Sequence, residues 1–411
     1  MHKRYSCREM GEIAGLFERH RVPKGDATPE QPRKNQDPHR KLHAGVFFDG
    51  TNNNKDRDRP HGKHTNVVRL WSVYREFSTA EAIHKKKYVD GVGSMDTSAR
   101  GRQAVRETVQ NTRWYNPPLT AAAASAGRYV ADMGHNAAGL MGGAGGKERL
   151  NRAYFWLKGE CAAMPRPGMK TVDVYGFSRG AALARTFVNL VNMALRREEP
   201  NITVRFVGVY DTVGSFGVAG DDSDPGQNMY IDGTDAAAIE HFTARHEFRQ
   251  NFPLTVITGV DREYAGAHSD VGGGYEPVDA DGRVNHLAMI PFKDMHTASV
   301  RAGVRMDPWE RENTERVPVE ELRARAERYA GAGPSLTAPD SPWLRERAEF
   351  FNTYIHESAS ANNESWWRTG LAVAAYRRWV DPHRRDSSGA RRKFTPRRFR
   401  LKGMPPGFDW E

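Results

Sequence analysis

One segment, residues 170–197, constrains the fold of this chain more than any other. It begins with the strand-like run Lys170-Thr-Val-Asp-Val-Tyr175 and turns through Gly176-Phe-Ser-Arg-Gly180. The residues that follow place apolar side chains on one helical face, and Pro200 lies just beyond the expected end of the helix. A strand that enters a helix through Gly-x-Ser-x-Gly is typical of a nucleophile elbow. The segment therefore predicts an α/β fold with Ser178 exposed at the edge of a sheet.

The two glycines of this turn have a steric reason. Gly176 and Gly180 lie two residues before and two residues after Ser178, where small residues let the strand and the helix approach without a clash. The N-terminus of the helix points at the turn, and its dipole favours developing negative charge. We expect Ser178 to be a nucleophile and the Arg179 N–H to be one donor of an oxyanion hole. The alternative is a structural turn bounded by glycines.

Strand and helix patterns alternate around this segment. Strands are predicted at 44–48, 87–90, 203–210 and 254–260, and helices at 9–20, 66–74, 119–141, 148–163, 319–329 and 364–379. Such alternation favours parallel strands joined by crossover helices. We expect an α/β-hydrolase fold: a mostly parallel central sheet flanked by helices, with helical insertions and a helical C-terminal region.

A serine hydroxyl needs a base to remove its proton, and the base needs an acid to fix its tautomer. In this fold the acid follows the serine along the chain and the histidine comes last. Asp211 directly follows the 203–210 strand, so it belongs to the same sheet edge as Ser178 and is the first candidate for the acid. Asp261 and Asp270 are the alternatives, and Asp270 is also a candidate for a supporting role.

The first candidate for the base is His268. It follows the 254–260 strand and opens the loop Ala267-His-Ser-Asp-Val-Gly-Gly-Gly-Tyr275, whose glycines allow the backbone to pass close to a substrate. His356 is the alternative base. His246 lies in a segment interpreted as helical, and we assign it a structural role.

A second oxyanion donor is expected from a loop after an early strand. Asp49-Gly50-Thr51 follows the 44–48 strand, so the N–H of Gly50 or of Thr51 is the candidate, with Asp49 orienting the loop. Acids and amides between Asp49 and Asp58 also suggest a cation site, but they lack the spacing of an EF-hand. We therefore predict neither a metal nor a cofactor.

Four blocks of the sequence, in this order, resemble an α/β-hydrolase family that includes bacterial type VI secretion phospholipase effectors. They are Phe47-Phe-Asp-Gly-Thr-Asn-Asn-Asn54, Val174-Tyr-Gly-Phe-Ser-Arg-Gly-Ala-Ala-Leu-Ala-Arg185, Gly208-Val-Tyr-Asp-Thr-Val-Gly-Ser-Phe-Gly217 and Gly266-Ala-His-Ser-Asp-Val-Gly-Gly-Gly-Tyr275. Two further segments, His246-Glu-Phe-Arg-Gln-Asn-Phe-Pro-Leu254 and Tyr354-Ile-His-Glu-Ser358, are also similar to family segments. The resemblance covers about residues 43 to 300.

The resemblance implies a triad of Ser178, Asp211 and His268 that hydrolyses phospholipid acyl esters of A1 or A2 type. It also implies a phospholipid membrane as substrate, with an immunity protein and a secretion spike or adaptor protein as partners. Members of the family lack signal peptides. We accordingly expect synthesis in the cytoplasm and secretion by a leaderless route into the periplasm or membrane of a target cell.

Most of the net charge of +10 is confined to one stretch. Between Arg377 and Lys402 there are eleven Lys or Arg residues and two Asp, an excess of nine positive charges. This basic stretch suits anionic lipid or an acidic partner, or is simply solvated. It carries no recognised nucleic-acid motif, so we do not expect nucleic-acid binding.

The same patterns suggest four regions: a polar N-terminal extension (1–42), a catalytic domain (43–300), a helical region or lid (301–382) and a basic tail (383–411). The N-terminus has no apolar run typical of a secretory signal, and charges and glycines argue against a membrane span at 120–146. The two cysteines, Cys7 and Cys161, predict no disulfide framework. A soluble carboxylesterase and a non-catalytic basic membrane-binding protein are the alternative functions.

Overall fold

A seven-stranded sheet forms the centre of the protein. The structure is a computed structural model that describes residues 38–94, 145–214, 227–247, 252–330 and 342–356. The strands lie in the order β2-β3-β1-β4-β5-β6-β7, and only the pairing of β2 with β3 is antiparallel. They are β1 (Lys41–Phe48), β2 (Phe77–Ser78), β3 (Ala82–Val89), β4 (Lys170–Phe177), β5 (Ile202–Tyr210), β6 (Ala238–Ala244) and β7 (Asp261–Tyr264). The predicted α/β class with a mostly parallel sheet is confirmed.

The register of the central strands aligns their carboxyl ends. Phe48 of β1 pairs with Gly176 of β4, and Phe177 of β4 pairs with Tyr210 of β5. Because parallel strands end at one edge of the sheet, the residues that follow β1, β4 and β5 lie side by side. These residues are Asp49, Ser178 and Asp211.

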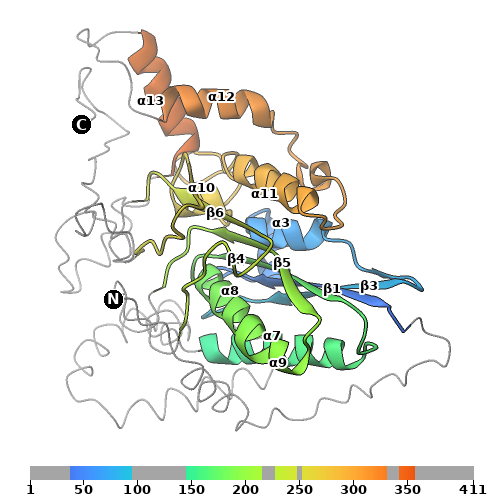
Figure 1. Cartoon of the computed structure of the whole chain (residues 1–411). Helices are drawn as coiled ribbons and strands as arrows, with labels where there is room; N and C mark the ends of the chain where they lie inside the picture. Colours follow the sequence, from blue (N-terminus) through green and yellow to red (C-terminus); the bar gives the residue numbers. More distant parts are fainter. Residues whose placement is uncertain (1–37, 95–144, 215–226, 248–251, 331–341, 357–411) are drawn as a thin grey trace, which may run out of the picture.

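Helices cover both faces of the sheet (Figure 1). On one face lie α7 (Gly146–Ala162) and α8 (Arg179–Leu190), and α8 continues through a π-helical turn at Val191–Leu195 into α9 (Arg196–Glu198). On the other face lie α3 (Asn66–Val73) and α11 (Met289–Arg301), with α12 (Val319–Tyr329) and α13 (Pro342–Tyr354) beyond them. Short elements complete the described part: α2 (Lys55–Asp58), η1 (Arg59–His61), α10 (His268–Gly272) and η3 (Trp309–Glu312).

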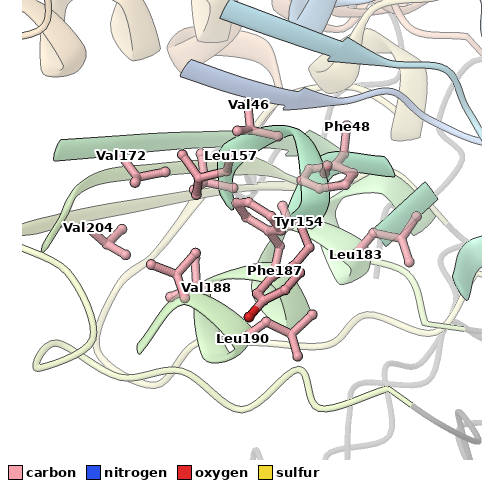
Figure 2. Close-up of a cluster of buried hydrophobic side chains, with 14 of the residues drawn as sticks. Val46, Phe48, Tyr154, Leu157, Val172, Leu183, Phe187, Val188, Leu190 and Val204 are labelled. Atoms are coloured by element: carbon pink, nitrogen blue, oxygen red, sulfur yellow. The ribbon is translucent and has the colours of Figure 1, made fainter. Parts of the chain in front are cut away.

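A layer of apolar side chains joins the sheet to α7 and α8 (Figure 2). Val46, Val172 and Val204 come from three neighbouring strands and are 0–3% exposed. Leu157 of α7 and Phe187 of α8 pack against them. Full burial of one such side chain stabilises the fold by about 2 kcal/mol. The apolar stripes of the two predicted helices therefore face the sheet.

A second apolar layer joins the opposite face of the sheet to the C-terminal helices. Phe47, Tyr175 and Phe206 belong to it, and so do Leu322 of α12 and Phe350 of α13. The helices after residue 305 thus share a core with the sheet. Among the described residues, no helix has both the length and the apolar composition needed to cross a membrane.

The predicted strand at 254–260 is wrong. Leu254 forms one isolated bridge with Val213, and the chain then turns, because the Asp261 carboxylate accepts the Ile257 N–H at 2.8 Å. Leu254, Val256 and Ile257 are buried in this loop. An apolar run signals burial and does not distinguish a buried loop from a buried strand. The sheet positions belong to β6 and β7, two strands that were not predicted from the sequence.

Two other predictions differ from the structure, one in where a strand begins and one in the type of secondary structure. The predicted strand 87–90 is the end of β3, which begins five residues earlier, at Ala82, with polar side chains along its edge. His246, expected in a helix, lies in the turn after β6.

The expected helices 9–20, 119–141 and 364–379 lie outside the described residues, as does Cys7. Cys161 is a free, buried thiol.

Candidate active site

Ser178 occupies a sharp turn between β4 and α8. Its backbone has φ 57° and ψ −128°, a region that a residue with a Cβ atom rarely adopts. A Cβ on Gly176 would lie 2.6 Å from the Ala181 Cα, and a Cβ on Gly180 would lie 2.2 Å from the Asp49 carbonyl oxygen. Only glycine fits at either position without a shift of the backbone. The predicted strand–turn–helix geometry is therefore present at Ser178. The expected exposure of Ser178 is wrong, because only 3% of its surface is exposed.

Asp211 directly follows β5 and lies beside this turn. Its Oδ1 accepts the Ala244 N–H at 2.8 Å, and its own N–H donates to the Phe242 carbonyl oxygen at 2.7 Å. Both partners belong to β6, so the neighbouring strand orients the carboxylate. The other oxygen, Oδ2, lies 2.5 Å from the Nδ1 of His268. Asp211 is completely buried, and this removes the competition of water for its oxygens.

His268 is the first residue of α10, and 4% of its surface is exposed. Its ring lies 4.5 Å from the ring of Phe177, the residue before Ser178, and 4.9 Å from the ring of Phe252. Its N–H donates to the Glu247 carboxylate at 3.3 Å. Because Nδ1 faces the carboxylate of Asp211, the ring proton belongs on Nδ1 and Nε2 is the basic nitrogen. The structure thus brings His268 to the same sheet edge as Ser178.

The candidate oxyanion loop lies against the elbow. The Arg179 guanidinium donates from Nε to the Thr51 hydroxyl at 2.8 Å, and Gly50 packs on the Phe177 ring. The Gly50 N–H donates to the Asp49 carboxylate at 2.8 Å. Within the described residues, the Thr51 N–H has no hydrogen-bond acceptor. The geometry therefore favours Thr51 over Gly50 as the donor from this loop.

Asp49 holds this loop through a network of hydrogen bonds. Its Oδ1 accepts the Gly50 N–H and the Thr65 hydroxyl at 2.8 and 2.6 Å, and its Oδ2 accepts the Tyr88 hydroxyl at 2.6 Å. Burial raises the pKa of Asp49 to about 6, although these hydrogen bonds oppose the shift. These contacts are the basis for the prediction that Asp49 orients the loop.

The alternative acids and bases have partners of their own. Asp261 accepts from Nδ1 of His241 at 2.8 Å, and Asp270 faces Nδ1 of His356 at 2.6 Å. His246 accepts the Gly266 N–H on Nδ1 at 2.8 Å. His241, His268 and His356 thus each face one carboxylate through Nδ1. Of these pairs in the described part of the chain, the one next to Ser178 is Asp211 with His268.

Several residues that support the site were not predicted from the sequence. Thr65 and Tyr88, which hold Asp49, carry no motif and become visible only through the fold. Glu247, which accepts the His268 N–H, lies in a segment that is similar to a family segment. Its side chain is buried, and the sequence alone does not reveal this burial.

The cation site considered between Asp49 and Asp58 does not form as a cluster. Asp58 accepts from the Asn54 N–H at 2.8 Å and from Arg57 Nε at 2.6 Å, while Asp49 is held by the network described above. Across the segments that the structure describes, no group of three or more His, Cys, Asp or Glu side chains is arranged to hold a metal ion.

Comparison with protein families decides where this chain belongs. Residues 44–195 and 192–298 match the family described as type VI secretion system phospholipase effector, Tle1-like, catalytic domain. The chain belongs to this family. The resemblance drawn from the four sequence blocks is confirmed, and the matched residues include Ser178, Asp211 and His268.

Two solved structures are similar to this Tle1-like chain. One is a Tle1 effector bound to the VgrG spike of the type VI secretion system, with 19% identity over 83% of this chain and 90% of that chain, and a TM-score of 0.48. The other is an uncharacterized protein from Pseudomonas aeruginosa, with 22% identity over 82% of this chain and 56% of that chain, and a TM-score of 0.44. Comparison with curated proteins found no match.

Proposed function

We propose that this Tle1-like chain is a serine-dependent phospholipase that cleaves the acyl ester bonds of membrane phospholipids. Ser178 is the nucleophile, His268 the base and Asp211 the acid. One observation carries this assignment: the Asp211 carboxylate lies 2.5 Å from Nδ1 of His268, at the sheet edge where Ser178 occupies its strained turn. Family membership supplies the substrate class.

The geometry supports a two-step acyl transfer. Nε2 of His268 takes the proton of Ser178 as Oγ attacks the acyl carbonyl carbon, and Asp211 stabilises the imidazolium. The tetrahedral intermediate collapses, and the imidazolium protonates the lysophospholipid oxygen as the ester bond breaks. The same histidine then activates a water molecule, which hydrolyses the acyl-enzyme and releases a fatty acid.

Two backbone N–H groups are proposed to hold the oxyanion. Arg179 is the first residue of α8, where the N–H direction and the helix dipole favour negative charge. Thr51 supplies the second donor from the loop that Asp49 orients. The Arg179 side chain ties the two donors together through its bond to the Thr51 hydroxyl.

The biological setting is proposed from the family alone. We infer an antibacterial effector that leaves the cell by the type VI route and reaches the periplasm or membrane of a target cell. A secretion spike or adaptor protein would carry it, and an immunity protein would neutralise it in the producing cell. We further propose catalytic residues 43–300, a helical region 301–382, an N-terminal extension 1–42 and a basic tail 383–411.

The decisive experiment measures fatty-acid release from phosphatidylethanolamine and phosphatidylglycerol vesicles labelled separately at each acyl position. We expect release by the wild type, a loss of about a thousandfold or more in Ser178→Ala, and a loss of about a hundredfold or more in Asp211→Asn, which disturbs the tautomer of His268. Ser72→Ala, a half-buried serine in α3, serves as the matched control and should keep wild-type activity. The labelled position that is released distinguishes A1 from A2 cleavage.

Other outcomes would redirect the proposal. Cleavage of short-chain esters without release from any lipid would retain the triad and indicate a soluble carboxylesterase. Equal release by wild type and Ser178→Ala would remove Ser178 as the nucleophile. The absence of activity on both phospholipids and short-chain esters would favour a non-catalytic, membrane-binding protein.

A further inference from the structure

A second carboxylate–imidazole pair joins the C-terminal helices to the loop that carries His268. Nδ1 of His356 lies 2.6 Å from Asp270 Oδ1, and the His356 N–H donates to Asp270 Oδ2 at 3.0 Å. Asp270 is completely buried, and His356 is 4% exposed. His356, which lies two residues after α13, is therefore hydrogen-bonded twice to a side chain of α10.

Asp270 also holds the backbone immediately before His268. Its Oδ2 accepts the Ala267 N–H at 2.9 Å, which fixes the first turn of α10. Gly266 has φ 110°, and a Cβ there would lie 2.3 Å from the Asp270 Cβ. The loop thus approaches the carboxylate so closely that only glycine fits. The Asp270 carboxylate sets where α10 begins, and His268 is its first residue.

Three more contacts, made through His246 and Tyr275, tie the same loop to residues after 329. His246 accepts the Gly266 N–H, its Nε2 lies 3.2 Å from the Ala330 carbonyl oxygen, and its ring meets the Phe351 ring edge-on at 5.3 Å. The His356 ring stacks on Tyr275 at 4.0 Å. The loop from 266 to 275 is therefore held at both ends by the C-terminal helices or by groups that contact them.

The surroundings of His356 do not suit a second base. Its Nε2 lies 3.8 Å from Asp279 Oδ2 and has no hydrogen-bond partner within the described part of the chain, so no serine hydroxyl of that part is hydrogen-bonded to it. Burial and stacking on Tyr275 hold the ring in place. These contacts match a role in fixing the Asp270 carboxylate.

We propose that Asp270 and His356 are positioning residues for His268. His356 fixes the Asp270 carboxylate, the carboxylate fixes the Ala267 N–H, and the start of α10 holds the imidazole in register with Asp211. The helical region after residue 301 is then part of the catalytic scaffold. This inference rests on the proposed function, in which His268 is the base.

The test compares three substitutions of His356 in the full-length chain. His356→Ala removes the donor to Asp270, His356→Asn keeps an N–H donor at the position of Nδ1, and His356→Gln moves it towards the position of Nε2. On a soluble short-chain ester, we expect His356→Ala and His356→Gln to lower kcat by about tenfold to a hundredfold with little change in KM, because the base is misplaced. His356→Asn should recover most of that loss.

A second measurement is independent of activity. Hydrogen exchange at the Ala267 amide should be faster in His356→Ala than in the wild type and close to the wild-type rate in His356→Asn. If His356→Ala does not fold, the contrast between His356→Asn and His356→Gln carries the same test.

Two results would overturn the positioning role. One is an unchanged kcat and an unchanged Ala267 exchange rate in His356→Ala. The other is a loss of kcat that is equal in all three variants and is accompanied by an equal loss of thermal stability. If the wild type cleaves neither the short-chain ester nor phospholipid, the proposed function has failed, and the Ala267 exchange alone decides whether His356 orders the loop.

Discussion

At the scale of single residues, backbone strain concentrates where the candidate site lies. The described segments contain four non-glycine residues with positive φ: Asn52, Ser178, Asp211 and Arg316. The first three follow the ends of β1, β4 and β5. Each such conformation costs about 1–3 kcal/mol, and it persists only where surrounding contacts enforce it. The hydrogen bonds from Ser178 N–H to the Tyr210 carbonyl oxygen and from Asp211 N–H to the Phe242 carbonyl oxygen are such contacts.

Asp49 makes the stability of the protein depend on pH. Its pKa rises from 3.8 to about 6 on folding, so its contribution to stability is full below pH 4 and is lost as the pH rises through 6. Asp49→Asn does not ionise, so from pH 4 to pH 7 the wild type should lose up to about 3 kcal/mol relative to the variant. Denaturant unfolding at several pH values measures the difference. A constant difference across this range would show that Asp49 is not held protonated by burial.

At the scale of elements, the contact between the start of α8 and the end of β1 builds the site. Gly180 lies so close to β1 that an added Cβ would meet the Phe48 and Asp49 carbonyl oxygens at 2.4 and 2.2 Å. This approach places the first turn of α8 beside the loop that carries Thr51. The glycine of the elbow thus joins the two elements that offer the candidate oxyanion donors.

Gly180→Ala should therefore impair both stability and activity. The new methyl group meets backbone atoms, so α8 must move, at a cost of about 1–3 kcal/mol in the free energy of unfolding. We expect kcat on a short-chain ester to fall by about tenfold or more because the donors separate. Gly159→Ala in α7 is the control: its Cβ meets nothing within 4 Å, and it should stabilise the helix by about 0.5–1 kcal/mol. Equal melting temperatures for the two variants would contradict this account.

At the scale of the whole molecule, charge is distributed unevenly. The excess of nine positive charges between residues 377 and 402 nearly equals the net charge of +10, so the catalytic body is close to neutral. A membrane phospholipase must bind a surface before it binds a substrate molecule. Anionic lipid attracts basic residues by about 1 kcal/mol each near the surface.

A chain that ends at residue 382 should separate docking from catalysis. It loses nine Lys or Arg residues, so we expect hydrolysis of phosphatidylglycerol vesicles to fall by about tenfold or more, while short-chain ester cleavage stays at the wild-type rate. Cosedimentation with anionic and with zwitterionic vesicles, at low and high salt, measures binding directly. Loss of both activities would instead assign the tail a structural role.

The sequence by itself determined the central elements and the elbow. The apolar runs that became β1, β4 and β5, and the helical stripe of α8, are local patterns, and the steric demand at Gly176 and Gly180 acts within a few residues. Such features depend on neighbours along the chain, so they can be inferred without the fold. The strands β6 and β7 were not predicted, because their residues are more polar than those of the buried loop between them.

Only the tertiary structure decided which carboxylate belongs to which histidine. Asp211, Asp261 and Asp270 were all plausible acids from the sequence, and each is paired with a histidine that lies 20 to 86 residues away. Such pairs depend on strand order and register and on the approach of the residues after α13 to α10, which bring distant segments within hydrogen-bond distance. Chain position leaves that choice open, because a hydrogen bond depends on atomic geometry.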